Sequence, residues 1–240
     1  MPVDVLAIAA HPDDIELTCA GTLVMLARRG RRFGIVDLTS GEMGTRGSSA
    51  GRAAEAKRAA EILGAEFRET LDLHDGGLET GRAAELAVIE VIRREKPRVV
   101  LTSYPDDRHP DHARAGRLVT DAAYYAGLRK LTTVSPAHRP QQVLYFSTFL
   151  VQEPSFLVDV TPAMDTRRAA ARAFASQFHD PASKEPQTML SAVSFLEAVE
   201  ARARHFGILA GVEFAEGFMS KRPPRIDDLV VAFEGFEAGF

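Results

Sequence analysis

The chain has 240 residues, 45% of them hydrophobic, and 29 basic residues against 33 acidic ones give a net charge of -4. This balance offers no basic field for a phosphate backbone, so the composition argues against a nucleic-acid partner. The single cysteine, Cys19, excludes an intrachain disulfide and a thiolate zinc cluster, and we expect it as a small buried side chain. We find no signal-peptide pattern and no apolar run of about 18 residues, so a cytoplasmic protein without a membrane partner is expected.

The first half of the chain alternates apolar strands with amphipathic helices. The expected elements are a strand at Val3–Ala10, a helix from a Thr18 cap to about Arg29, a strand at Arg32–Thr39, a helix at Arg52–Leu63, a strand at Phe67–Leu73, a helix at Arg82–Glu95, a strand at Arg98–Thr102 and a helix at Ala113–Ala126. The glycine- and serine-rich segment 40–51 between them is expected to be a mobile loop. Crossovers of this length favour a Rossmann-like α/β fold, with a doubly wound, mostly parallel sheet and helices on both faces.

Beyond residue 130 the alternation is less regular. We expect strands at Gln142–Thr148 and Phe156–Val160, a helix at Ala163–Phe178, a polar loop at His179–Gln187, a helix ending near Phe206 and a last apolar run at Leu229–Phe233. No segment has the length and polarity of a linker, so the sequence predicts a single domain over residues 1–240.

Two histidine-containing stretches each follow a predicted strand. Taken alone, His11-Pro12-Asp13-Asp14 is equally compatible with a turn whose carboxylates cap the next helix. The second stretch, His109-Pro110-Asp111-His112, follows the strand at 98–102, and the carboxyl ends of parallel strands meet at one edge of a sheet. Two histidines and one aspartate drawn from these stretches could hold Zn²⁺ and leave a position open for water, as in catalytic zinc sites.

Together with Thr39-Ser40-Gly41-Glu42, these stretches resemble the PIG-L/LmbE family of metal-dependent N-acetylglucosaminyl deacetylases. The similarity extends through segments 44–47 and 75–78, Arg52 and segment 216–218, and the bacillithiol-biosynthesis branch is the most similar. One departure concerns the local backbone path: many relatives have Gly-Cys-Gly-Gly where this chain has Thr18-Cys19-Ala20-Gly21.

The resemblance implies a role for each residue at a matching motif position. It implies that His11, Asp14 and His112 bind the metal, with Asp13 as general base and His109 as general acid. Beside a divalent cation, the Asp13 carboxylate would stay ionised and accept a proton from water. The carboxylate of Asp111 could fix the tautomer of His109 and favour its protonated form. The main alternative exchanges the roles of the two histidines.

The resemblance also implies a substrate, N-acetylglucosaminyl malate. Arg52 and Arg108 are candidates for binding its malate because a guanidinium matches a carboxylate, and surface salt bridges are the alternative role for both. Glu42, in the glycine-rich loop, is a candidate for substrate contact, with plain solvent exposure as the alternative. Zn²⁺ is the expected ion, although histidine and aspartate accept Fe²⁺ as well. Relatives are often hexameric, which is the basis for expecting a homo-oligomer.

Two other readings of the sequence remain open. One is a mycothiol-type or chitooligosaccharide deacetylase that uses the same site. The other is a non-catalytic module that binds a sugar or nucleotide, which is disfavoured because the first predicted strand-to-helix turn lacks G-x-G-x-x-G. Some relatives place a C-terminal tyrosine near the oxyanion, but no tyrosine follows Tyr145 here.

Overall fold

The computed structural model describes residues 2–148 and 152–234. The strands of these ranges form one seven-stranded sheet in the order β3-β2-β1-β4-β5-β7-β6. Their bounds are β1 Val5–Ala9, β2 Phe33–Asp37, β3 Phe67–Thr70, β4 Val99–Ser103, β5 Gln142–Phe146, β6 Phe156–Asp159 and β7 Ala215–Ser220. Strands β1 to β5 pair in parallel, and β7 runs antiparallel to both β5 and β6. The expected Rossmann-like, mostly parallel sheet is confirmed.

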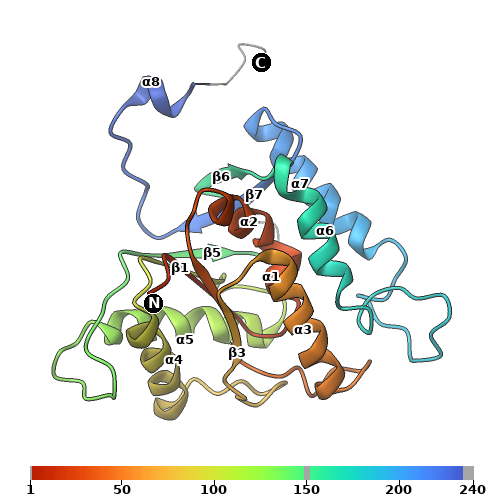
Figure 1. Cartoon of the computed structure of the whole chain (residues 1–240), viewed down its shortest axis with the longest axis horizontal. Helices are drawn as coiled ribbons and strands as arrows, with labels where there is room; N and C mark the ends of the chain where they lie inside the picture. Colours follow the sequence, from red (N-terminus) through yellow and green to blue (C-terminus); the bar gives the residue numbers. More distant parts are fainter. Residues whose placement is uncertain (1, 149–151, 235–240) are drawn as a thin grey trace.

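Helices cover both faces of this sheet (Figure 1). They are α1 Asp14–Thr18, α2 Ala20–Arg28, α3 Ser49–Leu63, α4 Arg82–Glu95, α5 Pro110–Ala126, α6 Met164–Arg172, α7 Phe195–Ala210 and α8 Leu229–Ala232, with a 3₁₀ turn, η1, at Thr161–Ala163. Because strand side chains alternate between faces, Leu6 and Ile8 of β1 pack in the cluster with α4 and α5. Val5, Ala7 and Ala9 pack in the other cluster, with α2, α3 and α6.

The strand order places a crevice beside β1 and β4. From β1 the sheet grows through β2 to β3 in one direction, whereas β4 and β5 extend it in the other. The loops that leave the carboxyl ends of β1 and β4 therefore turn away from each other, and such a switch point is where open α/β sheets bind ligands. Both histidine-containing stretches lie at this point.

Several predicted boundaries are wrong, and local hydrogen bonds explain most of them. The first helix does not begin at Thr18: α1 begins at Asp14, and the Thr18 hydroxyl donates to the Asp14 carbonyl oxygen at 2.6 Å instead of capping a helix. Helix α5 begins three residues early, at Pro110, because a fixed proline φ suits the first helical position. Helix α3 begins at Ser49, where the Ser48 side chain accepts from Gly51 N–H. The long helix expected after Ala163 ends at Arg172.

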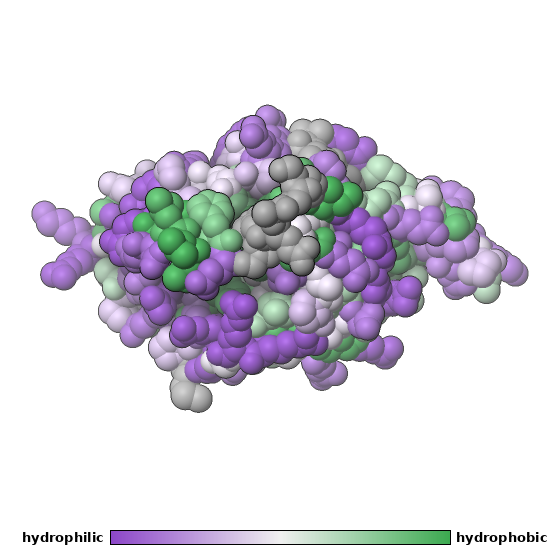
Figure 2. Space-filling model, turned by 90° about the horizontal axis from the view of Figure 1, so that it is seen from above, coloured by the Kyte–Doolittle hydropathy of each residue, from purple (hydrophilic) through white to green (hydrophobic). Residues whose placement is uncertain are grey.

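The C-terminal part contains two features that the sequence did not predict. The glycine-punctuated segment 207–220 includes β7, which pairs on both sides. The apolar run Leu229–Phe233 forms the short α8, which stands away from the body in Figure 1. Its side chains are exposed and give a hydrophobic patch on the face shown in Figure 2. Within the two described ranges, no helix has the length and apolar character needed to cross a membrane.

Candidate active site

The turn after β1 presents His11, Asp13 and Asp14 through an unusual backbone. Asp13 is the N-cap residue of α1 but makes no side-chain capping bond, and its φ is 107°, a region that residues other than glycine rarely adopt and that is often found at functional sites. Within the turn, the amide of His11 donates to Asp14 Oδ2 at 3.0 Å. All three side chains are buried. The turn is thus held in one conformation, with its imidazole and carboxylates directed inward.

The N-terminus of α5 supplies the other histidines. His109 is its N-cap, and His109 Nδ1 accepts a hydrogen bond from the amide of Asp111 at 3.2 Å. His112 lies in the first turn and is buried. A main-chain N–H can only donate, so this contact fixes Nδ1 of His109 as an acceptor and leaves Nε2 to carry the proton. The sequence had suggested that the Asp111 carboxylate fixes the tautomer of His109. In the structure this carboxylate accepts from the amides of Gly76 and Leu78 at 2.8 and 3.2 Å.

Three of the predicted residues converge on one point. Nδ1 of His11 is 3.3 Å from Nε2 of His112, which is 3.1 Å from Oδ1 of Asp14. Nδ1 of His11 is also 3.6 Å from Oδ2 of Asp14. Four-coordinate zinc has bonds of about 2.0–2.1 Å, so its ligand atoms stand about 3.3 Å apart. The donor set and its spacing therefore fit a divalent ion.

The outer nitrogens of the same imidazoles face carboxylates. Nε2 of His11 is 2.9 Å from Oδ1 of Asp75, and Nδ1 of His112 is 3.2 Å from Oδ1 of Asp107. Metal-binding histidines usually have such a carboxylate on the nitrogen that does not face the metal, because it fixes the tautomer and the ring orientation. Asp75 and Asp107 were not assigned a role from sequence. Nothing in their local pattern indicates it, since each meets its histidine only in the folded chain.

Other groupings in this cluster could also hold an ion. His109 brings a third imidazole, and the atoms of His11, His109 and His112 lie within 4.8 Å of one another, as do those of His11, Asp75 and Asp111. In the set with Asp14, the contacts that join Nδ1 of His11, Nε2 of His112 and the Asp14 carboxylate span 3.1–3.6 Å, which is close to the spacing of zinc ligands.

The electrostatics of the cluster suit a cation. Burial alone would lower the pKa of His112, but Asp14 and Asp107 raise it to about 9. Burial also disfavours the charged form of His11, yet its contacts with Asp111, Asp14 and Asp75 hold its pKa well above the usual range. Burial opposes ionisation of Asp14, while His112 and His11 keep the pKa of that carboxyl well below its usual value. The carboxylates thus draw protons onto both imidazoles, a charge that a divalent ion would supply instead.

Asp13 lies beside this cluster and is held by Arg52. The Arg52 Nη2 donates to Oδ2 of Asp13 at 3.0 Å and to Oε1 of Gln177 at 2.9 Å, and its Nη1 donates to the Gly41 carbonyl oxygen at 3.2 Å. Burial raises the pKa of Asp13 to about 6, and Arg52 acts in the opposite direction. Arg52, expected to bind substrate, is therefore engaged with the candidate base. Gln177, which the sequence did not single out, accepts from the same Arg52 nitrogen that holds Asp13.

These residues surround a cavity of about 300 Å³, whose lining also includes His109, Met43, Arg46, Asp75, Thr148 and Thr188. The loop expected to be mobile is fixed on one side of it, since the buried Arg46 donates to the carbonyl oxygens of Ser176 and Pro186 at 3.0 and 3.1 Å. Glu42 accepts from the Asp75 amide at 2.7 Å and is not among the residues that line the cavity. Arg108 is exposed and also lies outside that lining.

Comparison with known proteins places this geometry in a family. A family model described as GlcNAc-PI de-N-acetylase, PIG-L, matches residues 6–123. The diacetylchitobiose deacetylase of Thermococcus kodakarensis is 31% identical over 225 residues, covering 89% of this chain and 81% of the relative. The chain belongs to the PIG-L family.

Two further similarities cover much of this PIG-L chain. A Bacillus anthracis protein named "Probable N-acetyl-alpha-D-glucosaminyl L-malate deacetylase 2" is 31% identical over 193 residues, covering 72% of this chain and 81% of its own. The crystal structure of the conserved protein TT1542 from Thermus thermophilus matches with a TM-score of 0.86 and 37% identity, covering 95% of this chain and 98% of that one. The family resemblance recognised in the motifs is thereby confirmed.

Proposed function

We propose that this PIG-L chain is a metal-dependent amide hydrolase that removes the acetyl group from an N-acetylglucosamine conjugate. The observation that carries the proposal is the convergence of His11, Asp14 and His112 beside Asp13, at the wall of one cavity. Relatives named as deacetylases of diacetylchitobiose and of an N-acetylglucosaminyl malate support the same chemistry.

His11, Asp14 and His112 would hold the ion, which we propose to be Zn²⁺, with Fe²⁺ compatible with the same donors. The bound ion would supply Lewis acidity, lowering the pKa of a water molecule and polarising the acetyl carbonyl. Asp13 would take the proton from that water as its oxygen attacks the carbonyl carbon. Since Arg52 holds Oδ2 of Asp13, Oδ1 is the oxygen left for this transfer.

For His109 we propose a task that differs from the general-acid role implied by the family resemblance. Its Nδ1 accepts from a main-chain amide, so the neutral ring offers an Nε2–H donor to the oxyanion. The amine then leaves with the proton that Asp13 has taken, which balances the reaction without a protonated histidine. Asp111 would act through its amide, which sets this tautomer.

The arginines of the cavity help to identify the aglycone, which is the group attached to the N-acetylglucosamine of the substrate. N-acetylglucosaminyl malate, the substrate implied by the bacillithiol branch, needs cations for its malate. The two arginines that line the cavity, Arg46 and Arg52, are each hydrogen-bonded to the protein. This favours a neutral N-acetylglucosamine disaccharide as a second candidate, in keeping with the relative that covers 89% of this chain.

Acetate release from a small panel of substrates tests the proposal. Metal-loaded protein should hydrolyse either N-acetylglucosaminyl malate or diacetylchitobiose, and the relative kcat/KM identifies the aglycone. Asp13→Asn should retain the metal and lose turnover, whereas His11→Ala should lose the metal. If the loaded wild-type protein left the whole panel intact, the proposed function would be wrong.

A further inference from the structure

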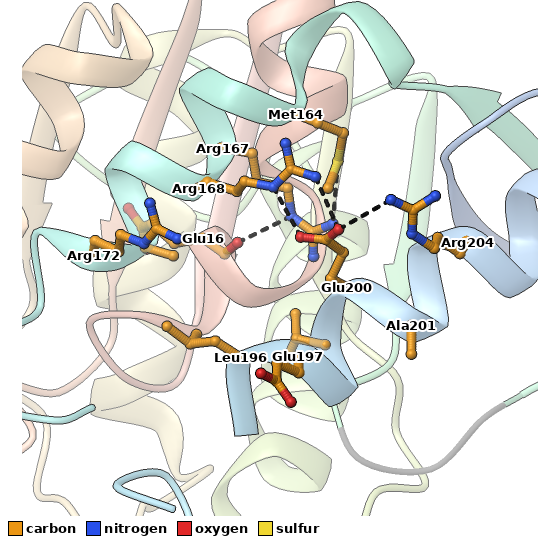
Figure 3. Close-up of a pocket in the computed structure, with 12 residues that line it drawn as sticks. Glu16, Met164, Arg167, Arg168, Arg172, Leu196, Glu197, Glu200, Ala201 and Arg204 are labelled. Atoms are coloured by element: carbon orange, nitrogen blue, oxygen red, sulfur yellow. Dashed lines mark hydrogen bonds and ion pairs between the residues drawn. The ribbon is translucent and has the colours of Figure 1, made fainter. Parts of the chain in front are cut away.

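A second cavity of about 300 Å³ lies between α6 and α7 (Figure 3). It shares no lining residue with the candidate active site. Its walls are apolar on both sides: Met164 and Ala171 come from α6, and Leu196 and Val199 come from α7. A concave site with apolar walls and a few charged groups is the usual form of a small-molecule pocket.

Some charged groups of this cavity are already paired. Glu200 accepts from Nε and Nη2 of Arg168 at 2.8 and 2.9 Å, and Nη2 of Arg204 approaches the same carboxylate at 3.5 Å (Figure 3). These three side chains tie α6 to α7 and form a fixed end of the cavity. Arg168 also pairs with Asp165, and Arg204 also pairs with Glu213. The charges at this end of the cavity are therefore already paired within the protein.

Two other charged residues of the lining are unpaired within the part of the chain that the structure describes. Arg172 on α6 and Glu197 on α7 are exposed, and neither forms a hydrogen bond or ion pair with any residue of the described ranges. Within the described residues, Arg172 and Glu197 also do not form an ion pair with each other, although they line the same cavity and carry opposite charges. A cation and an anion are therefore both available to a ligand.

The buried side of the cavity also holds a cation, Arg167, and an anion, Glu16, and each is paired with a charge elsewhere in the protein. Arg167 is only 4% exposed, and its Nε and Nη2 donate to the carbonyl oxygens of Glu16 and Leu17 at 3.3 and 2.8 Å. Its Nε also lies 3.4 Å from Oε1 of Glu216. Among the described residues, the third nitrogen, Nη1, has only the Met164 sulfur at 3.9 Å, and a thioether is a weak acceptor. Glu16 is fully buried, and its Oε1 accepts from Nη1 of Arg68 at 2.6 Å, whereas its Oε2 has no hydrogen-bond partner in the described structure. One acceptor, Oε2 of Glu16, is thus unsatisfied, which is costly in a folded protein, and one donor has only a weak acceptor.

We propose that this cavity binds a free α-amino acid with an aliphatic side chain. A ligand with only a carboxylate would leave Glu197 unpaired, and a ligand with only an amine would leave Arg172 unpaired. A zwitterion can form an ion pair with each of them. The carboxylate would face Arg172 and Nη1 of Arg167, and the ammonium would face Glu197, with Glu16 adding negative potential from the floor. The side chain would lie against Leu196, Val199 and Met164.

Isothermal titration of the full-length protein with three matched probes tests the chemistry. L-leucine should bind saturably at one site per chain. 4-Methylpentanoate lacks the amino group and 3-methylbutan-1-amine lacks the carboxylate, so each should bind at least about tenfold more weakly. No binding of leucine up to about 10 mM, or equal binding of either analogue, would overturn the proposal.

Substitutions locate the site. Arg172→Gln and Glu197→Gln should each weaken leucine binding about tenfold, since each removes one ion pair with the ligand. Arg58→Gln, at an exposed arginine of α3 outside this cavity, should leave the affinity unchanged. None of these residues belongs to the candidate active site, so deacetylation of the panel should persist in all three variants. Leucine binding that survived both cavity substitutions would show a different site and refute the proposal.

Discussion

The orientation of Asp13 depends on side chains behind it that no substrate needs to touch. Nη2 of Arg52 donates one hydrogen bond to Oδ2 of Asp13 and another to Oε1 of Gln177. The amide nitrogen of Gln177 in turn donates to the Arg46 carbonyl oxygen at 3.0 Å. A loop that follows α6 therefore sets the direction of the candidate base.

We expect Gln177→Met to lower kcat about tenfold or more while changing KM little, because small misplacements of a reacting group are costly. Steady-state acetate release measures both constants. Glu55→Gln is the matched control: Glu55 accepts from the amide and hydroxyl of Ser176 and anchors the same loop without touching Arg52. A positioning role also predicts that Gln177→Met adds nothing in an Arg52→Met background. Equal losses from Glu55→Gln would mean that loop integrity alone matters.

The residues around Asp13 show what the sequence could and could not predict. That the stretches with His11, Asp14 and His112 meet was predictable because two short motifs follow strands whose ends must meet, and the family resemblance singled out these three residues. Asp75 and Gln177 were not, since their partners lie 64 and 125 residues away, and Asp107, 5 residues before His112, lies outside the motif 109–112. We expected Arg52 to bind a substrate. Its contact with Asp13 forms only when the chain folds, so the local sequence around Arg52 does not indicate it.

At the scale of elements, the close approach of α5 to β4 positions His112. A Cβ added at Gly116 of α5 would lie 2.3 Å from the Ser103 carbonyl oxygen and 3.0 Å from the Pro105 nitrogen, and both are main-chain atoms. Only glycine lets the helix approach the end of β4 this closely. The strand alternation and helical spacing predicted both elements, but this contact depends on their docking.

Gly116→Ala should therefore destabilise the fold by about 1–3 kcal/mol and weaken metal binding, because α5 must move with its first turn. Urea unfolding and metal titration measure the two effects. Gly81→Ala is the control, since a Cβ there meets nothing within 4 Å. An alanine variant with unchanged stability and metal affinity would show that α5 can shift without moving His112.

A buried arginine joins α4 to the segment after α5. Arg93 is 1% exposed, and it donates to the carbonyl oxygens of Ala126, Leu128 and Leu131 at 2.9, 2.8 and 2.8 Å. We expect Arg93→Met to cost about 3 kcal/mol in unfolding free energy, because three main-chain acceptors, one of them fully buried, lose their donor. The neighbour Arg94 forms only exposed pairs, so Arg94→Met should cost less than about 0.5 kcal/mol. Similar unfolding midpoints in urea for the two variants would contradict this account.

At the scale of the whole molecule, the C-terminal segment contributes little to the folded body. Every residue from 221 to 234 is exposed, and Asp228 caps α8 from within the segment. Ending the chain after Pro224 should change Tm by less than about 2 °C and remove the patch that includes Leu229, Val230 and Phe233. Differential scanning calorimetry checks the first expectation, and dye binding to hydrophobic surface checks the second. A larger fall in Tm would indicate that this segment packs in the predicted homo-oligomer.

The candidate metal centre joins parts of the chain that are distant in sequence, so its occupancy should be visible in global stability. Asp14 lies on helix α1 and His112 lies on helix α5. Both side chains lie beside His11, at the crevice next to β1 and β4. An ion that binds only the folded chain stabilises it by about 2.7 kcal/mol at about 100 times its Kd. For a protein of this size, this corresponds to a rise in Tm of about 5–10 °C, which a chelator should reverse. His11→Ala should abolish the dependence of Tm on added Zn²⁺, whereas Asp13→Asn should keep it, because Asp13 contacts Arg52 and not the inward nitrogens. An unchanged Tm on chelation and reloading, with metal content verified in each sample, would refute a metal at this position.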